Sequence, residues 1–192
     1  MGSGAGAGTG AAVAFPPGLM YNQLHMDHLW TPWRLAYLQG DRPLPTGCLF
    51  CTKPEQPDPE AHIVHRGDFG YVILNRFPYN NGHLIVAPYA HLASLEDLDI
   101  EAAGELMALT QLSLRVLREA YNAEGFNVGA NIGGAAGAGV DDHVHMHIVP
   151  RWAGDTNYMT TIGETRLIPE WIDQMYDRLR PLFERIDQTD DR

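Results

Sequence analysis

The chain lacks a long hydrophobic run. No apolar stretch in its 192 residues approaches the ~20 residues that a membrane-spanning helix requires, so we expect no membrane segment. The opening M-G-S-G-A-G-A-G-T-G also lacks the basic region and the continuous apolar core of a secretory signal. These two absences predict a cytoplasmic protein.

Basic residues are also scarce. Only 13 lysines and arginines stand against 24 aspartates and glutamates, which gives a formal net charge of −11. Non-specific binding to nucleic acid depends on neutralising phosphates with Lys and Arg, so this balance excludes it. A phosphorylated small molecule remains compatible, because a pocket needs only local positive potential from backbone N–H groups or one or two arginines.

Cysteine is limited to one pair. Cys48 and Cys51 have the C-x-x-C spacing and are the 2 cysteines of the sequence. In a cytoplasmic chain such a pair is typical of a metal site or a redox site rather than of a structural disulfide. Zinc would need two further ligands.

The composition predicts one folded domain with extensions at both ends. A hydrophobic content of 45% is sufficient for a core. Residues 1–24 are rich in Gly and Ala, and we interpret them as a disordered extension or a segment left by cloning. We expect a single domain over 25–186 and a solvated acidic tail over 187–192.

Hydrophobic periodicity predicts an α+β fold with a largely antiparallel sheet. Strands are expected at 63–64, 71–74, 83–88 and 126–132, followed by a fifth around the histidines described next. Apolar residues at helical spacing predict a long helix over 99–122, with Asp97 or Asp99 as its N-cap. A short aromatic helix is expected over 29–38, and a last helix over 168–186, interrupted or bent before Pro181.

Three histidines at alternate positions form the most informative pattern. His143, His145 and His147 alternate with apolar residues, which is typical of a strand with one face in the core, so the three imidazoles leave the same face. A core has no need of three adjacent imidazoles, because each buried ring carries two nitrogens that require partners. The row therefore predicts chemistry: either it binds a metal, or one ring is a nucleophile that its neighbours tune.

The run H-V-H-M-H-I-V resembles the H-φ-H-φ-H-φ-φ motif (φ, apolar) of the histidine triad (HIT) superfamily of nucleotide hydrolases and nucleotidyl transferases. The resemblance covers about residues 29–165 and includes N-R-F-P-Y-N-N-G-H-L-I-V-A-P and G-A-N-I-G. The stretch P-R-W-A-G-D-T-N-Y-M is similar to the bacterial branch that contains diadenosine tetraphosphate phosphorylases. The resemblance implies a HIT-like α+β fold: a mostly antiparallel five-stranded sheet, one long helix and a C-terminal helix.

The resemblance also implies roles for individual residues. His145 matches the nucleophile, which attacks the α-phosphorus of a nucleotide and forms a covalent nucleotidyl-histidine. His147 matches the phosphate-facing position, and Asn131 matches the amide that contacts the phosphates. Gly137 and Gly139 belong to a glycine-rich loop whose backbone N–H groups can approach a phosphate.

Other positions of the motif leave alternatives open. Asn75 matches a residue that contacts ribose hydroxyls, but a turn-forming Asn is an equal interpretation. Arg151 could supply charge to a phosphate or lie exposed. Gly139 stands where many relatives carry Gln, and the loop is one residue longer, so substrate orientation and acceptor are the least transferable features.

The resemblance also completes a metal site. Zinc-bearing relatives combine such a cysteine pair with two histidines. One lies near the end of the antiparallel strands expected over 63–88, and the other is the first histidine of the triad. The implied structural zinc ligands are Cys48, Cys51, His91 and His143. His62 and His65 form an H-x-x-H pair that offers alternative ligands or plain surface residues, and the surface interpretation is favoured.

The leading hypothesis is a HIT-type enzyme that cuts dinucleoside polyphosphates at the α-phosphate. Inorganic phosphate as acceptor would make it a phosphorylase, which the similarity around W-A-G-D-T-N favours, and water would make it a hydrolase. A non-catalytic zinc- and nucleotide-binding regulatory module and an enzyme with a catalytic metal on the histidine row are the alternatives. The resemblance further implies a homodimer.

Overall fold

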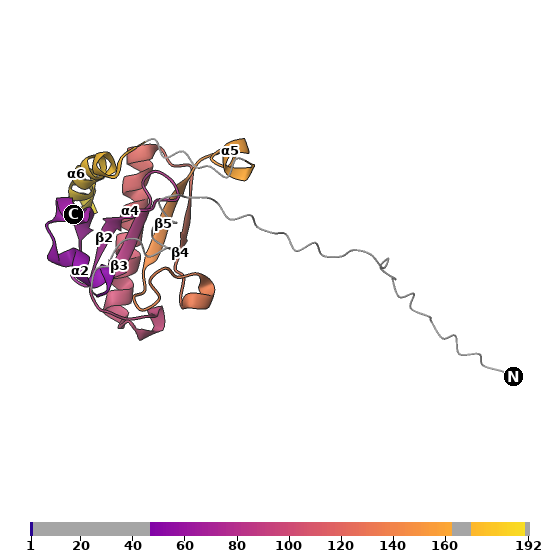
Figure 1. Ribbon diagram of the computed structural model, residues 1–192, viewed down its shortest axis with the longest axis horizontal. Coiled ribbons are helices and arrows are strands. Elements are labelled where there is room, and N and C mark those ends of the chain that lie inside the picture. Colours follow the sequence, from indigo (N-terminus) through magenta and orange to yellow (C-terminus); the bar gives the residue numbers. More distant parts are fainter. Residues whose placement is uncertain (2–46, 163–169, 191–192) are drawn as a thin grey trace.

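The computed structural model describes Met1, 47–162 and 170–190. The predicted extension and the predicted aromatic helix over 29–38 therefore lie outside the described residues, apart from Met1. The described part contains a five-stranded sheet in the order β1-β2-β3-β5-β4, and every neighbouring pair is antiparallel (Figure 1). The strands are β1 (Ile63–Arg66), β2 (Gly70–Leu74), β3 (Leu84–Pro88), β4 (Gly125–Gly129) and β5 (Met146–Arg151).

Two long helices cover one face of this sheet. They are α4 (Ile100–Tyr121) and α6 (Ile172–Asp190), which confirms the predicted fold class. The short helices are α2 (Leu49–Thr52), α3 (Asp58–Ala61) and α5 (Tyr158–Thr161), with the 3-10 turns η1 (Lys53–Glu55), η2 (Leu95–Asp97) and η3 (Gly134–Ala136). In the described part of the chain, no helix combines the length and apolar character needed to cross a membrane.

The long helix begins where the sequence predicts. The side chain of Asp99 accepts a hydrogen bond from the backbone N–H of Ala102 at 2.7 Å, which satisfies a helix donor that would otherwise lack a partner. Leu109, Val116 and other apolar side chains of α4 face the sheet and pack with Leu179 and Phe183 of α6. Burying each such side chain contributes about 1.5–3 kcal/mol, so this layer supplies the main core.

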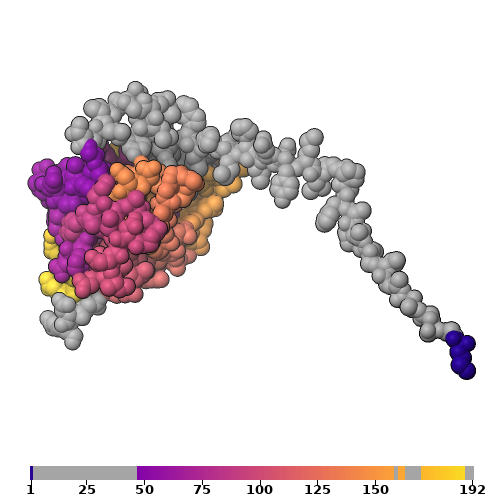
Figure 2. All heavy atoms as spheres, turned by 90° about the horizontal axis from the view of Figure 1, so that it is seen from below, coloured from indigo at the N-terminus to yellow at the C-terminus, as the bar shows by residue number. Residues whose placement is uncertain are grey.

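The opposite face of the sheet carries a second, smaller cluster. Side chains alternate along β3, so Leu84 and Val86 point to the helices whereas Ile85 and Ala87 point away from them. Phe50 from α2 covers this second face. Val140, which follows the glycine-rich loop, packs against the same cluster, and the space-filling view shows the purple α2 segment and the orange loop segment on one side of the molecule (Figure 2).

The strand that carries the histidines is shorter than predicted. β5 begins at Met146, so only His147 of the three histidines lies in it. Before that point the chain bends at His143, and the backbone N–H of Val144 donates to the carbonyl of Leu92 at 2.7 Å. The alternating histidines and apolar residues predict a segment with one buried face and one exposed face, but this contrast is absent. Val144 is buried, and so are His143 and His145, because both faces of the sheet are covered.

Two other boundaries differ from the predictions. β4 ends at Gly129, three residues before the predicted limit at Ile132. Helix α6 runs without interruption through Pro181 to Asp190, so its last turn occupies 187–190, which we had expected to be tail. Leu179 and Phe183 on either side of Pro181 are fully buried, and this packing outweighs the hydrogen bond that proline cannot donate.

Candidate active site and metal centre

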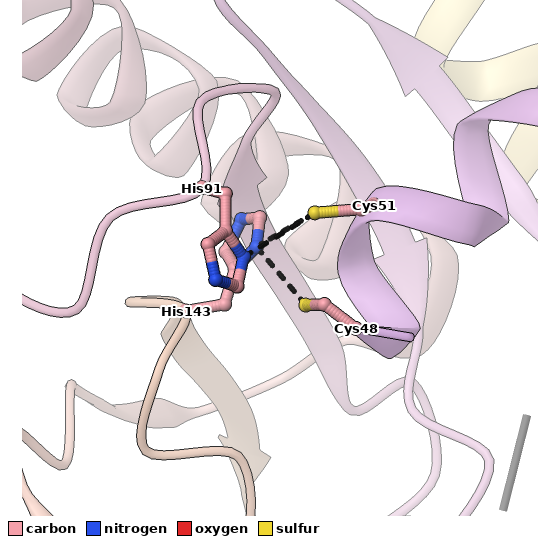
Figure 3. A group of neighbouring side chains, drawn as sticks. All are labelled: Cys48, Cys51, His91 and His143. Carbon is pink, nitrogen blue, oxygen red and sulfur yellow. Dashed lines mark hydrogen bonds between the residues drawn. The ribbon is translucent and has the colours of Figure 1, made fainter. Parts of the chain in front are cut away.

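Two cysteines and two histidines from distant parts of the sequence meet at one point. Nδ1 of His143 lies 3.3 Å from Sγ of Cys48 and 3.6 Å from Sγ of Cys51. Nδ1 of His91 lies 3.4 Å from Sγ of Cys51, and the four ligand atoms all lie within 4.8 Å of one another (Figure 3). The structure therefore brings together the four residues that the resemblance implies as a ligand set.

The chemistry of this cluster fits a tetrahedral metal. Bond lengths of about 2.3 Å to sulfur and about 2.0–2.1 Å to nitrogen place neighbouring ligand atoms about 3.5 Å apart, close to the distances found here. Nε2 of His143 lies 2.9 Å from the carbonyl of Pro88, to which it must donate, so the lone pair of Nδ1 faces the sulfurs. Burial and the neighbouring Cys48 raise the pKa of the Cys51 thiol, and a bound cation would act in the opposite direction by stabilising its thiolate.

His145 has a defined tautomer. Its Nδ1 lies 2.8 Å from the backbone carbonyl of His143, which can only accept, so Nδ1 carries the proton and Nε2 keeps its lone pair. The ring packs between Phe50, at 4.5 Å between centroids, and His147, at 4.9 Å. Burial lowers the pKa of His145, so the ring is neutral at neutral pH. An uncharged imidazole with a fixed free lone pair is able to act as a nucleophile.

A second hydrogen-bond chain fixes the tautomer of His147. The backbone N–H of Tyr79 donates to Nδ1 of His83 at 3.0 Å, so the proton of His83 resides on Nε2. That N–H faces Nδ1 of His147 at 3.0 Å, which leaves the proton of His147 on Nε2. Burial and the neighbouring imidazoles lower the pKa of His83 to about 3 and that of His147 to about 4, so both rings are neutral donors.

His83 is a site residue that the sequence interpretation missed. It lies just before β3 in the alternation that places Ile85 and Ala87 on the face opposite the helices. Register pairs Ile85 with His147, so His83 lies close to the end of the histidine row. The sequence does show a histidine at alternate spacing with these apolar residues. This spacing indicates a place beside the histidine row only when the strand pairing is known.

The predicted nucleotide contacts lie in two segments. Asn75 holds the turn before β3: its Nδ2 lies 3.2 Å from Nδ1 of His83, and its Oδ1 accepts from the backbone N–H of Phe77 at 2.9 Å. Asn131 is half-buried at the start of the glycine-rich loop. In that loop Gly137 has a φ of +82°, a conformation that side chains rarely adopt, whereas Gly139 has open space around it and no such φ.

Arg151 is not a free positive charge. Its Nε and Nη2 donate to the two oxygens of Asp155 at 2.6 and 2.7 Å, and its Nη1 donates to Oδ1 of Asn127 at 2.6 Å. The guanidinium holds the pKa of Asp155 far below its usual range. This bidentate pair corrects the interpretation of an exposed Arg151, because the residue is half-buried and its charge is paired with a carboxylate.

His62 and His65 are not plain surface residues, although the surface interpretation was favoured. Nε2 of His62 lies 2.7 Å from a carboxylate oxygen of Asp173, and the ring of His65 stacks on Phe183 at 5.6 Å between centroids. Both histidines therefore attach β1 and its approach to α6, and neither belongs to the metal cluster.

Each histidine of the row thus has a separate environment. His143 is the member that belongs to the cysteine cluster, which is the one group of three or more potential metal ligands in the described residues. His145 and His147 bond to a backbone carbonyl and to His83 instead. The three rings do not form a common ligand set, which rules out the predicted alternative of a catalytic metal bound by the whole row.

Comparison with known proteins identifies the family. A family model described as the HIT domain matches residues 56–154, just over half of the chain. AP-4-A phosphorylase from Mycobacterium tuberculosis is 44% identical over 154 residues, which cover 76% of this chain and 78% of that protein. The chain belongs to the HIT family. The identity to this relative also confirms the prediction of a HIT-type enzyme.

Solved HIT structures share the fold. A zinc-bound histidine triad family protein from Mycobacterium smegmatis superimposes with a TM-score of 0.61 and 27% identity, covering 74% of this chain and 97% of that one. A hypothetical histidine triad nucleotide-binding protein from Sulfolobus tokodaii gives a TM-score of 0.60 and 26% identity, covering 74% and 95%. These likenesses confirm the predicted HIT-like architecture.

We expect acid to destabilise the fold through the neutral pair His83 and His147. In the unfolded chain both titrate near pH 6.5, whereas in the fold their pKa values are about 3 and about 4. The unfolded state therefore binds more protons below about pH 6.5, and the free energy of unfolding falls as the pH is lowered toward 4. His83→Gln should make this dependence shallower in urea unfolding at pH 7 and pH 5, because glutamine keeps both hydrogen bonds without titrating.

The control is His62→Gln, which changes a histidine outside the row. All samples carry the same metal content, so that loss of metal in acid affects them equally. An unchanged slope for His83→Gln would mean that His83 binds protons equally in the folded and unfolded states, which would contradict its lowered pKa in the fold.

Proposed function

We propose that this protein is a nucleotidyl transferase that cleaves dinucleoside polyphosphates at the α-phosphate and passes the nucleotidyl group to inorganic phosphate, as a diadenosine tetraphosphate phosphorylase. The observation that carries the proposal is the fixed tautomer of His145, whose Nε2 keeps a lone pair because Nδ1 donates to the carbonyl of His143. The 44% identity to AP-4-A phosphorylase supports the choice of substrate and acceptor.

The reaction proceeds in two displacements. Nε2 of His145 attacks the α-phosphorus, the bond from that phosphorus to the bridging oxygen breaks, and the oxygen leaves with the electron pair as part of a nucleoside triphosphate. Nε2–H of His147 lies at the end of the chain from Tyr79 through His83 and supplies a hydrogen bond to this oxygen. An oxygen of inorganic phosphate then attacks the nucleotidyl-histidine, which releases a nucleoside diphosphate and restores His145.

The remaining predicted residues hold the substrate in this proposal. Backbone N–H groups of the loop that contains Gly137 and Gly139 face the phosphates, together with the amide of Asn131. Asn75 reaches the ribose with the second hydrogen of Nδ2 and the second lone pair of Oδ1, since its contacts to His83 and Phe77 use only one of each.

The acceptor and the nucleophile are tested in one assay. We expect diadenosine tetraphosphate to give ADP and ATP only when inorganic phosphate is present, and His145→Asn to reduce turnover by about 10³-fold or more with little loss of nucleotide affinity. Products are separated by chromatography, and affinity is measured by calorimetry. The control is His65→Asn, a histidine that packs against α6.

Three results would contradict the proposal. AMP and ATP formed without phosphate would identify a hydrolase that uses water as the acceptor. Full activity in His145→Asn would assign the nucleophile to another residue, and binding without turnover of any dinucleotide would favour the non-catalytic regulatory module.

We further propose that the Cys48, Cys51, His91 and His143 cluster binds a structural zinc ion. Four protein ligands close the coordination sphere, so the ion would supply cross-linking rather than an activated water. It would join α2, which carries Phe50, to the segment that leads into β5. The zinc-bound histidine triad protein from M. smegmatis supports the identity of the metal.

Zinc binding is tested by metal analysis. We expect about one zinc per chain in the wild type, and Cys48→Ser should lose the metal and lower the melting temperature, because metal affinity adds directly to folding free energy. Thr52→Ser in the same short helix serves as the control and should retain the zinc. A wild type without stoichiometric zinc would remove this part of the proposal.

We also propose a homodimer that pairs through β4. This strand lies at the edge of the sheet, and Val128 on it is 43% exposed. Edge strands present unpaired backbone groups to a partner. Light scattering after size exclusion should give the mass of a dimer, and Val128→Lys should reduce it to that of a monomer, whereas Phe69→Lys at the β1–β2 turn should not. A monomeric wild type at micromolar concentration would contradict this interface.

A further inference from the structure

A pocket lies beside His147, on the side away from the nucleophile. Its volume is about 320 Å³, within the range of small-molecule sites. It is enclosed by β4, β5 and the turn before β3, on the face of the sheet opposite α4 and α6. The lining includes Tyr79, Asn127, Gly129, Asn131, His147 and Val149, and Arg151 closes one end.

The charges around this pocket are compensated. Three nitrogens of Arg151 already donate to Asp155 and Asn127, and the same carboxylate also accepts from Nδ2 of Asn80 at 3.1 Å and from the backbone N–H of Trp152 at 3.2 Å. His147 is neutral because its pKa is lowered to about 4. The pocket therefore offers a phosphate group no cation that is not already paired.

The walls instead suit a planar heteroaromatic ring. Tyr79 is 36% exposed and stacks over His147, with ring centroids 6.0 Å apart and planes inclined by 27°. Val149 adds a buried aliphatic surface, and Asn127 adds an amide nitrogen that can donate a hydrogen bond. Stacking on an aromatic side chain with polar contacts at the ring edge is how proteins bind nucleobases.

The position of the pocket indicates which base it would take. His145 has Phe50 on one side of its ring and His147 on the other. In an in-line displacement at the α-phosphorus, the leaving oxygen departs toward the group that donates a hydrogen bond to it, which is Nε2–H of His147. The part of the substrate beyond that oxygen therefore continues past His147, toward Tyr79 and β4.

From this arrangement we propose that the pocket binds the nucleoside at the far end of the leaving group, so that it selects dinucleoside over mononucleoside polyphosphates. The inference rests on the function proposed above and adds a specificity site to it. Tyr79 and Gly129 both line the pocket, and so does Arg151, which is held by Asp155. Once the leaving group departs, the same side is open to the acceptor, which attacks the phosphorus from that direction.

Gly129 allows the pocket to be filled without disturbing the fold. A Cβ added at this position meets no atom within 4 Å, and its φ lies outside the left-handed region. Gly129 pairs with His147 across the β4–β5 ladder, so a side chain placed there projects beside the imidazole into the pocket. Gly129→Leu therefore blocks the cavity, and Tyr79→Ala removes its aromatic wall.

The test measures binding, so that it does not depend on turnover. Diadenosine tetraphosphate and adenosine 5′-tetraphosphate, which lacks the second nucleoside, are titrated by calorimetry into His145→Asn protein with and without each pocket substitution. We expect Gly129→Leu and Tyr79→Ala to weaken binding of the dinucleotide by about 10-fold or more, the scale of one lost base stack, with less than about 2-fold effect on the mononucleotide.

The matched control is Gly104→Leu, because Gly104 is exposed on α4 and also has no atom within 4 Å of an added Cβ. It should leave both affinities unchanged, and the oligomeric state of every variant is checked by light scattering. Equal weakening of both nucleotides, or of neither, would overturn the inference. Failure of the proposed function gives a different pattern, namely selective binding of the dinucleotide by a wild type that does not turn it over.

Discussion

The hydrogen bond from Nδ1 of His145 to the carbonyl of His143 is the contact on which the site depends. It is 2.8 Å long and decides which nitrogen of the nucleophile keeps a lone pair. The acceptor belongs to a residue whose own ring faces Cys48 and Cys51 and donates to the carbonyl of Pro88 at 2.9 Å. One residue therefore takes part in the Cys–His cluster through its side chain and in the proposed catalytic site through its backbone. A shift of His143 would move both.

The short helix α2 strengthens this coupling. Cys48 and Cys51 contribute the sulfurs, while Phe50 between them packs on the rings of both His143 and His145. The hydroxyl of Tyr71 donates to the carbonyl of Phe50 at 2.7 Å, so the helix is fixed to β2 as well. The Cys–His cluster and Tyr71 thus position the aromatic ring that covers one side of the proposed nucleophile, and burial of this kind lowers the pKa of His145.

Some of this arrangement could be predicted from the sequence and some could not. The period-two row and the C-x-x-C pair are local patterns, and the similarity to HIT proteins supplied His91 as their distant partner. His83 was missed because its role depends on the pairing of Ile85 with His147, which no local pattern records.

Contacts between distant or irregular segments explain the other differences. The strand that carries the histidines was predicted to begin too early because the backbone of Val144 bonds to that of Leu92, which is far away in the sequence. The pairing of Arg151 with Asp155 was missed because an i, i+4 spacing outside a helix carries no expectation of contact.

The charge distribution explains how an acidic chain can handle a polyanionic substrate. The formal charge of the whole chain is −11, but at the site Arg151 is paired with Asp155, and lowered pKa values keep the rings of His83, His145 and His147 uncharged at neutral pH. In the function proposed above, the phosphates are recognised by neutral donors, the N–H of His147 and the backbone of the glycine-rich loop. Such donors stabilise charge that develops in the transition state, yet they hold a charged product less tightly than a fixed cation would. The proposed transfer releases two nucleoside polyphosphates, and a site of this kind would favour that release.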